Sequence, residues 1–272
     1  MKKILLSYFV IACTGFSFAQ SGLWKSVTKR SDAVTVANKT SIMSPRLFDL
    51  DADQLKSQLS QAPKRFSGLR SEVIIAFPNG EGQFENFRIN ENPNMEPALA
   101  ARYPNIKSYI GQGIENPSTT IYFSISPLGL QTMTLYPDRS AVFIEPYTTD
   151  LSAYAVYRKS DKTASLSSFE CKVIATVNDD MGTAMLRPNA DDAFLRTFRL
   201  AMSVTGEYTA YFGGTKALAL AAINNSMTRV NGVFEKDFAA RMVLISNNDA
   251  VIYTNASTDP YSPGSTGAGG AW

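Results

Sequence analysis

The pattern of apolar and polar positions changes in character near residue 178. From Gln20 to about Ser168, short apolar runs alternate with turn sequences, which is typical of closely spaced antiparallel strands. The aromatic residues in these runs are expected to pack a sheet. We predict strands at Ser71–Phe77, Gln83–Ile89, Thr119–Ser126, Leu130–Tyr136 and Ser140–Glu145, with turns such as Pro127-Leu128-Gly129 between them.

Two helical segments are expected within this β-rich region. Residues 48–61 carry Leu55 and Leu59 after Asp51 and Asp53, which predicts one short helix or a turn followed by a helix. Ala98–Tyr103 predicts a second short helix. The Gly-punctuated stretch 104–113 that follows is expected to interrupt the β pattern.

The C-terminal part of the chain predicts a different local fold. Leu195–Val204 alternates like a strand, and Ala240–Ile245 predicts another. Between them, Thr215–Asp237 is expected to be a long helix, because its apolar residues recur every three or four positions. A strand, a helix and a strand in this order form a βαβ unit with parallel strands in a right-handed crossover. The fold class is therefore α+β: a mainly antiparallel β region followed by an incomplete α/β unit.

Three boundaries follow from these patterns. The N-terminal β-rich region covers residues 20–178, a polar linker rich in helix breakers covers 179–193, and the βαβ part covers 194–272. A parallel pair with one helix leaves much sheet surface uncovered. Either the chain is the early part of a longer protein, or the first region covers this surface.

Residues 1–19 have the features of a signal peptide. Lys2 and Lys3 precede the apolar run Ile4–Phe16, and small residues then predict cleavage between Ala19 and Gln20. A lipidated Cys13 is the alternative. A transmembrane helix needs about 20 consecutive apolar residues, and no later segment has an apolar run near this length. The protein is therefore expected to be secreted, periplasmic or at the cell surface.

Composition excludes several kinds of chemistry. The chain has no histidine, so it cannot supply a His-ligated zinc or haem site, a Ser-His-Asp triad or a Cys-His dyad. A net charge of +2 argues against a nucleic-acid partner. Glu81 and Glu85 are interpreted as solvated acids on turns and strand faces. Cys171, the one cysteine after the signal, is a buried apolar residue on a strand, pairs with a cysteine of another chain, or is a metal ligand.

The C-terminal part resembles a known family. Leu195–Tyr208, Met227–Phe238, Met242–Ile245 and Asn247–Asn255 are similar to the start of a reprolysin-like (adamalysin-type) zinc metalloendopeptidase of the secreted Bacteroidetes type. The stretch Tyr103–Tyr109 with Gly111 is similar to the propeptide of such enzymes. The resemblance implies a secreted proenzyme with a metzincin-like catalytic domain, whose N-terminal region assists folding and masks the active site.

The resemblance also implies a zinc ion held by the helix signature H-E-x-x-H-x-x-G-x-x-H, which this chain lacks. We therefore assign no catalytic residue and no ligand of a mature metal site. We interpret Glu207 as a turn residue, and Glu235 and Asp237 as a solvated helix end. Related propeptides inhibit through a cysteine thiolate on the zinc, which makes Cys171 a candidate switch ligand.

Three functions follow. The first is a precursor fragment of a zinc-dependent endopeptidase, which acts on proteins or peptides when complete but is itself inactive and binds no stoichiometric zinc. The second is a secreted module without enzymatic activity that binds or inhibits a peptidase in trans. The third is an adhesion or carbohydrate-binding β protein.

Overall fold

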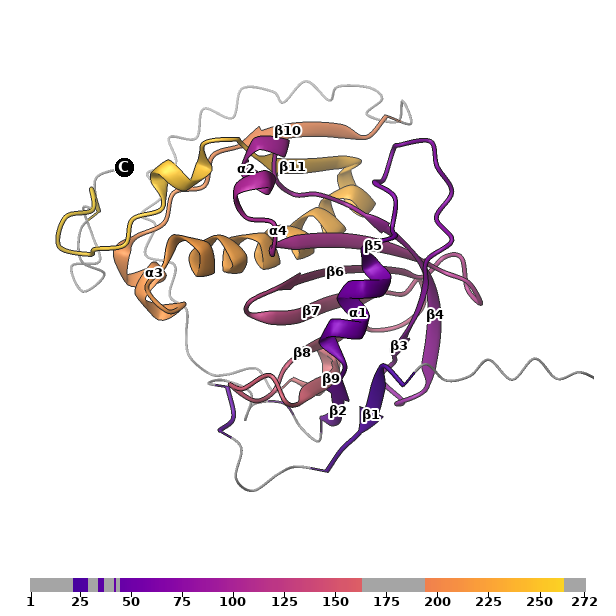
Figure 1. The fold of residues 1–272 in the computed structure, drawn as a ribbon. Coiled ribbons are helices and arrows are strands. Elements are labelled where there is room, and N and C mark those ends of the chain that lie inside the picture. Colours follow the sequence, from indigo (N-terminus) through magenta and orange to yellow (C-terminus); the bar gives the residue numbers. More distant parts are fainter. Residues whose placement is uncertain (1–21, 29–33, 37–41, 43–44, 163–193, 262–272) are drawn as a thin grey trace, which may run out of the picture.

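A computed structural model describes residues 22–28, 34–36, 42, 45–162 and 194–261 (Figure 1). Within this part, nine strands form one antiparallel sheet in the order β1-β2-β9-β8-β7-β6-β5-β4-β3. The strands are β1 Trp24–Ser26, β2 Arg46–Leu50, β3 Ile74–Pro78, β4 Phe84–Glu91, β5 Lys107–Gly113, β6 Thr120–Ser126, β7 Gly129–Leu135, β8 Val142–Pro146 and β9 Tyr154–Arg158. Helices α1 (Ala52–Leu59) and α2 (Pro97–Arg102) and a 3-10 turn at Lys159–Asp161 complete residues 22–162, the N-terminal region.

The sheet curls around an apolar core, and its two edges meet. The indole nitrogen of Trp24 in β1 donates a hydrogen bond of 2.9 Å to the carbonyl of Ala76 in β3. The Trp24 ring also packs against Phe77, with 6.1 Å between ring centroids. Helix α1 closes the core with Leu55 and Leu59, both buried. The aromatic residues of this core therefore pack the sheet, as the sequence predicted.

Every predicted strand of this region exists, with ends shifted by at most three residues, but four strands were missed. Strand β5 occupies the stretch predicted to be irregular. Its Gly111 marks a close approach, because a Cβ there would lie 2.6 Å from Cδ1 of Ile89. The prediction of one helical segment over 48–61 was wrong at its start. Residues 46–50 form β2, and the helix begins after Asp51, whose carboxylate accepts from the amide of Gln54 at 2.8 Å.

Residues 194–261 form a second body, the C-terminal unit. It contains β10 (Arg196–Leu200), α3 (Gly206–Tyr211), α4 (Lys216–Phe238), β11 (Ala240–Leu244) and a 3-10 turn at Asn248–Val251. Strands β10 and β11 pair in parallel, and α4 lies in the connection between them, which confirms the predicted βαβ unit. The hydroxyl of Thr215 caps the start of α4 by accepting from Leu218, and Ala239 ends the helix in the left-handed conformation.

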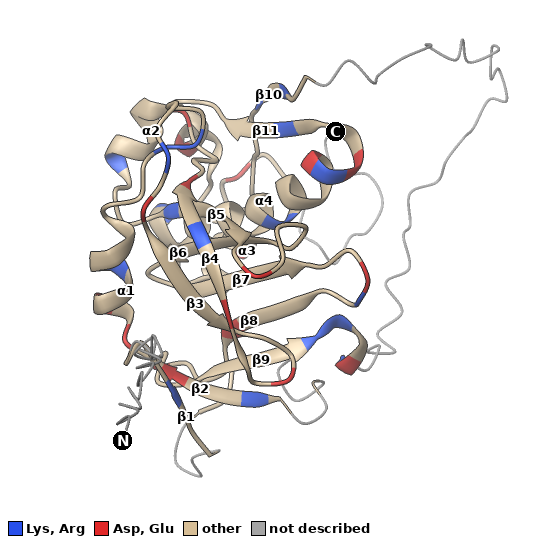
Figure 2. Ribbon diagram, turned by 90° about the vertical axis from the view of Figure 1, so that its right-hand side faces the viewer, with Lys and Arg blue, Asp and Glu red and all other residues tan. Residues whose placement is uncertain are grey.

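Helix α4 lies between the two sheets. One side packs against β11, and the other against the outer face of β5, β6 and β7 (Figures 1 and 2). The N-terminal region therefore covers the helix flank that the βαβ unit leaves open. In Figure 2 neither sign of charge gathers on one side of the ribbon.

Several predictions fall on residues outside the described part. These are the signal peptide with its cleavage site at Ala19 and Gln20, the linker at 179–193, and Cys13 and Cys171. They stay predictions. Among the described residues, no helix is both long and apolar enough to cross a membrane.

Candidate functional site at the interface between the two regions

Helix α4 presents a stripe of polar residues to the N-terminal sheet. Asn224, Thr228 and Asn231 are buried and recur every three or four positions, so they lie on one helix face. The amide of Asn94 donates 2.8 Å to the Thr228 hydroxyl, and the amide of Asn231 donates 3.0 Å to the Asn94 side-chain oxygen. Asn231 also holds both the amide and the carbonyl of Met242, each at 2.8 Å. One buried amide therefore joins α4, β11 and the N-terminal region.

On the side of the sheet, small residues with hydroxyl groups contact α4. The hydroxyl of Ser108 in β5 lies 3.3 Å from the side-chain oxygen of Asn224, and Ser124 in β6 is hydrogen-bonded to Asn225. Small side chains on both surfaces let the backbones approach closely. At Gly232, a Cβ would lie 2.7 Å from Cε of Met133. The contact is therefore both polar and tightly packed.

The N-terminal region also adds a strand-like segment to the small sheet. The amide of Leu244 donates to the carbonyl of Asn94 at 2.8 Å, and the amide of Glu96 donates to the carbonyl of Leu244 at 2.9 Å. Met95 is thereby bridged in parallel to Leu244, on the edge of β11 that β10 does not use. This is strand addition between two parts of one chain.

Helix α2 continues this segment and binds the loop after β11. Its N-cap residue, Glu96, accepts hydrogen bonds from Arg199 at 2.6 Å and from the amide and hydroxyl of Ser246 at 2.8 and 2.6 Å. The bond from Arg199, followed by those from Ser246, lowers the pKa of Glu96 to about 2. At the other end of α2, Arg102 forms a two-point ion pair with Asp249, at 3.1 and 2.9 Å.

A cluster of charged side chains is buried beside the C-terminal end of α4. The side chain of Glu235 is 4% exposed, and its carboxylate accepts from Arg65 at 2.6 Å and from the Tyr122 hydroxyl at 3.3 Å. Both donors belong to the N-terminal region. Burial, with the charge of Glu235, raises the pKa of Tyr122 to about 12, so the phenol stays protonated.

Arg241 completes this cluster from the C-terminal unit. Its side chain is 6% exposed, and it donates to Asn92 at 2.8 Å and to the carbonyl of Pro93 at 2.7 Å. Burial lowers the pKa of Arg241. Its Nε lies 3.8 Å from the Oε1 of Glu235. Within the C-terminal unit, Glu235 thus accepts hydrogen bonds from residues of the N-terminal region, and Arg241 donates hydrogen bonds to residues of that region.

The interpretation of Glu235 as part of a solvated helix end was therefore wrong. Periodicity places a residue on a helix face, but it cannot reveal that another segment covers that face. The signal available in the sequence was the pair Asn224-Asn225 followed by Asn231, which lie among the apolar residues of the helix. Asp237 is exposed, as predicted, but the interpretation of Glu207 as a turn residue was wrong. Glu207 lies in the first turn of α3.

The two acids predicted to be solvated on strands and turns are in fact paired. Glu81 pairs with Arg158. Glu85, whose side chain is 21% exposed, accepts from Arg139 at 3.0 Å and from the Tyr136 hydroxyl at 2.8 Å. Both sites hold the ends of strands together, since their partners lie on or beside β7 and β9. Glu85 and Glu115 both line one small cavity, together with Arg139.

The residues that the structure describes do not fit a zinc site. Among the described residues, no group of three or more His, Cys, Asp or Glu is placed to hold a metal ion. The full sequence supplies no imidazole at all. We therefore derive no catalytic step from this chain, and the switch role of Cys171 is untested.

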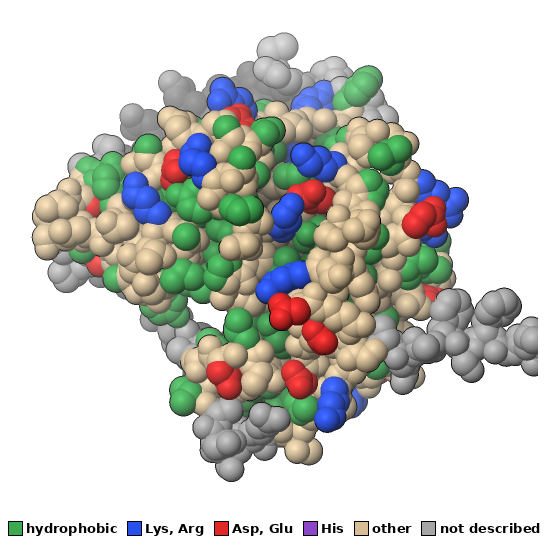
Figure 3. Space-filling model, viewed as in Figure 1, with side chains coloured by type: hydrophobic (Ala, Val, Ile, Leu, Met, Phe, Trp, Pro, Cys, Tyr) green, Lys and Arg blue, Asp and Glu red, His purple; other side chains and the backbone are tan. Residues whose placement is uncertain are grey.

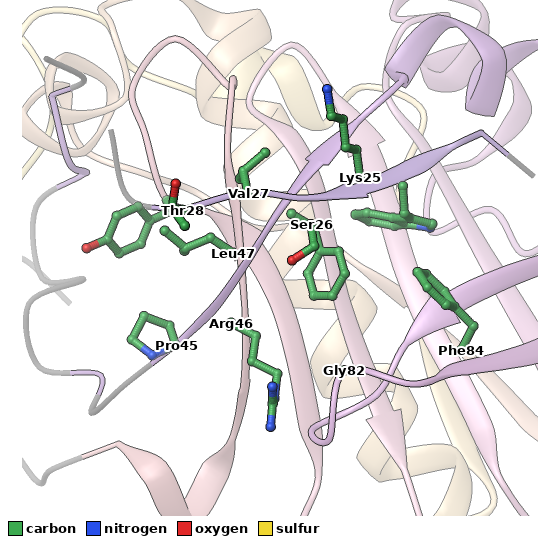
Figure 4. Close-up of a pocket in the computed structure, with 12 residues that line it drawn as sticks. Lys25, Ser26, Val27, Thr28, Pro45, Arg46, Leu47, Gly82 and Phe84 are labelled. Carbon is green, nitrogen blue, oxygen red and sulfur yellow. The ribbon is translucent and has the colours of Figure 1, made fainter. Parts of the chain in front are cut away.

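A shallow cavity of about 740 Å³ lies where β1 and β2 meet the start of β4 (Figure 4). Lys25 and Arg46 line it but point in opposite directions, and Arg46 is bound to the carbonyl of Gly80 at 3.2 Å. Because its polar groups do not converge, this cavity has no arrangement typical of a binding site. The interface is the better candidate.

Comparison with known proteins identifies a family model that matches the C-terminal part of the chain. Residues 195–272 match the model of the family described as metallo-peptidase family M12B, reprolysin-like. The match begins at the start of the C-terminal unit and leaves the nine-stranded sheet outside it. No curated protein and no solved structure shows a significant match.

Proposed function

We propose that this chain is a precursor segment of a secreted zinc-dependent metalloendopeptidase of the reprolysin-like type. In this proposal, the N-terminal region is a propeptide and the C-terminal unit is the start of the peptidase domain. The family match supports the second assignment. The zinc site and the hydrolysis of peptide bonds belong to the full-length enzyme, and the signal peptide directs export.

The proposal rests on one observation. Residues of the N-terminal region provide the hydrogen-bond partners of buried polar residues in the C-terminal unit. Arg65 and Tyr122 bind Glu235, Asn92 binds Arg241, and Asn94 binds Asn231. An unpaired polar group costs about 1–3 kcal/mol when buried, and a charged one costs more. The C-terminal unit is therefore stabilised by the N-terminal region, as expected of a propeptide that assists folding.

Expression of the two parts tests this proposal. We expect residues 194–272 alone to be insoluble or unfolded by circular dichroism, and co-expression with residues 20–178 to recover a soluble complex. A fragment 194–272 that folds equally well alone would contradict the folding role.

A second proposed function is the binding of a separate peptidase, and it is favoured by the fact that the sheet has its own core. Residues such as Phe123 and Ile121 are buried around the centre of the sheet without help from the C-terminal unit. The N-terminal region is thus suited to bind a peptidase in trans. Adding the purified chain to a mature reprolysin-like peptidase tests this: slower casein cleavage supports it, and an unchanged rate at micromolar chain contradicts it. The chain alone is expected to cut no casein.

A further inference from the structure

A second cavity lies at the mouth of the curled sheet, apart from the interface. It has a volume of about 500 Å³ and is bounded by the end of α1, the ends of β4 and β6 and the start of β5. This volume lies in the range of sites for small molecules, and the mouth of a curled sheet is a common place for them. Its apolar lining consists of Leu59, Pro104, Tyr109, Ile125 and Pro127.

Tyr109 gives this cavity an unused hydrogen-bond donor. The residue is 4% exposed, and its ring stacks on Phe123 with 5.1 Å between centroids. Within the described part of the chain its hydroxyl has no hydrogen-bond partner, and the oxygen is not among the side-chain atoms closed off from solvent, so a ligand in the cavity can reach it. Burial, with the carboxylate of Glu91 opposite it on β4, raises the pKa of Tyr109 well above its usual range. The hydroxyl is therefore a donor at neutral pH.

The charges around the cavity favour an anion. Lys56 and Lys107 line it, with side chains 58% and 43% exposed, and Glu91 is the acid of the lining. Lys107 pairs with Glu91 at 3.0 Å, while Lys56 pairs at 3.3 Å with Asp53, which is 96% exposed and outside the cavity. The lining thus carries one more positive than negative charge. The face in Figure 3 shows such neighbouring basic and acidic side chains over α1 and the adjacent strands.

We propose that this cavity binds a small amphipathic carboxylate. The carboxylate accepts the hydrogen bond of the Tyr109 hydroxyl and lies beside the ammonium groups of Lys56 and Lys107. The apolar part packs on Leu59 and Ile125. A fatty acid and a peptide that ends in an apolar residue share this chemistry. The proposal concerns residues of the N-terminal region alone and is independent of the precursor function.

Calorimetric titration of the full chain tests the proposal with two carboxylates, octanoate and N-acetyl-leucine, and with their uncharged amides. We expect at least one carboxylate to bind and its amide to bind about tenfold more weakly, because a hydrogen bond to a charged group is stronger than one to a neutral group. Octanoate alone would indicate a lipid-derived ligand, and N-acetyl-leucine alone a peptide terminus. Absence of binding by both at millimolar concentration would overturn the proposal, as would equal binding of acid and amide.

Two variants locate the site. Tyr109→Phe keeps the stacked ring and removes the donor, so carboxylate binding is expected to weaken about tenfold while the midpoint of unfolding changes little. Tyr211→Phe is the matched control, because Tyr211 is an exposed tyrosine outside the cavity. Wild-type affinity in Tyr109→Phe, or an equal loss in Tyr211→Phe, would place binding elsewhere and refute the proposal.

Discussion

Replacement of Arg65 by Met tests the buried charge cluster that joins the two regions. The change keeps much of the apolar stem but leaves Glu235, 4% exposed, without its 2.6 Å partner. Removing one partner of a buried ion pair typically costs about 3–5 kcal/mol. Two features reduce this value: the Arg65 side chain is 24% exposed, and Arg241 stays 3.8 Å from Glu235. We therefore expect the free energy of unfolding to fall by about 2–3 kcal/mol.

Urea unfolding of the full chain, followed by circular dichroism, measures this loss. Arg88→Met is a matched control, because the Arg88 side chain is 25% exposed but its acidic partner Glu72 is 84% exposed. Its expected cost is about 1 kcal/mol, mainly from the hydrogen bond to the carbonyl of Ser71. Adding Glu235→Gln to Arg65→Met should recover part of the loss, because the unpaired charge disappears. Equal costs for Arg65→Met and Arg88→Met, with no recovery in the double variant, would refute the reasoning.

Three further predictions concern the closure of the sheet, the loss of stability at acidic pH and the packing of the interface. Trp24→Phe removes the hydrogen bond to Ala76 and should lower the free energy of unfolding by about 1–2 kcal/mol, measured by urea titration; an unchanged midpoint would contradict closure through Trp24. The pKa of Glu96 is about 2 in the folded protein and 4.5 by its ordinary value, so its stabilising effect is complete above pH 4.5 and is lost as the pH falls toward 2. Glu96→Gln should therefore reduce the difference in melting temperature between pH 5 and pH 3, whereas an undiminished difference would argue against this role. Gly232→Ala places a methyl group 2.7 Å from Cε of Met133 and should cost about 1–3 kcal/mol in chemical denaturation, and a neutral result would show that the interface is looser than described.

The sequence predicts the C-terminal unit better than the sheet, for physical reasons. Helix α4 is long, has an apolar stripe and begins at a Thr that caps it, so local signals define it. Strand β5 contains Gly111, which the sequence presents as a breaker. A glycine is required there because the side chain of Ile89 on the neighbouring strand leaves no room for a Cβ, and this contact exists only once the strands are paired.

The interface was the least predictable feature. Arg65 and Glu235 are 170 positions apart, and nothing local to either residue indicates the other. The polar stripe on α4 signals that this face meets something other than an apolar core, but not what it meets. The absence of histidine, in contrast, is a property of composition, so the sequence alone excludes a His-ligated zinc site built from this chain.

The central claim is that the N-terminal region holds the C-terminal unit through the interface itself and not only through the connecting chain. A site for a sequence-specific protease, inserted within residues 179–193 of the full chain, allows the connection to be cut after folding. We predict that the two pieces elute together in gel filtration at micromolar concentration, since the buried contacts of Arg65, Asn94 and Glu96 remain. Separate elution of two folded pieces would contradict the account.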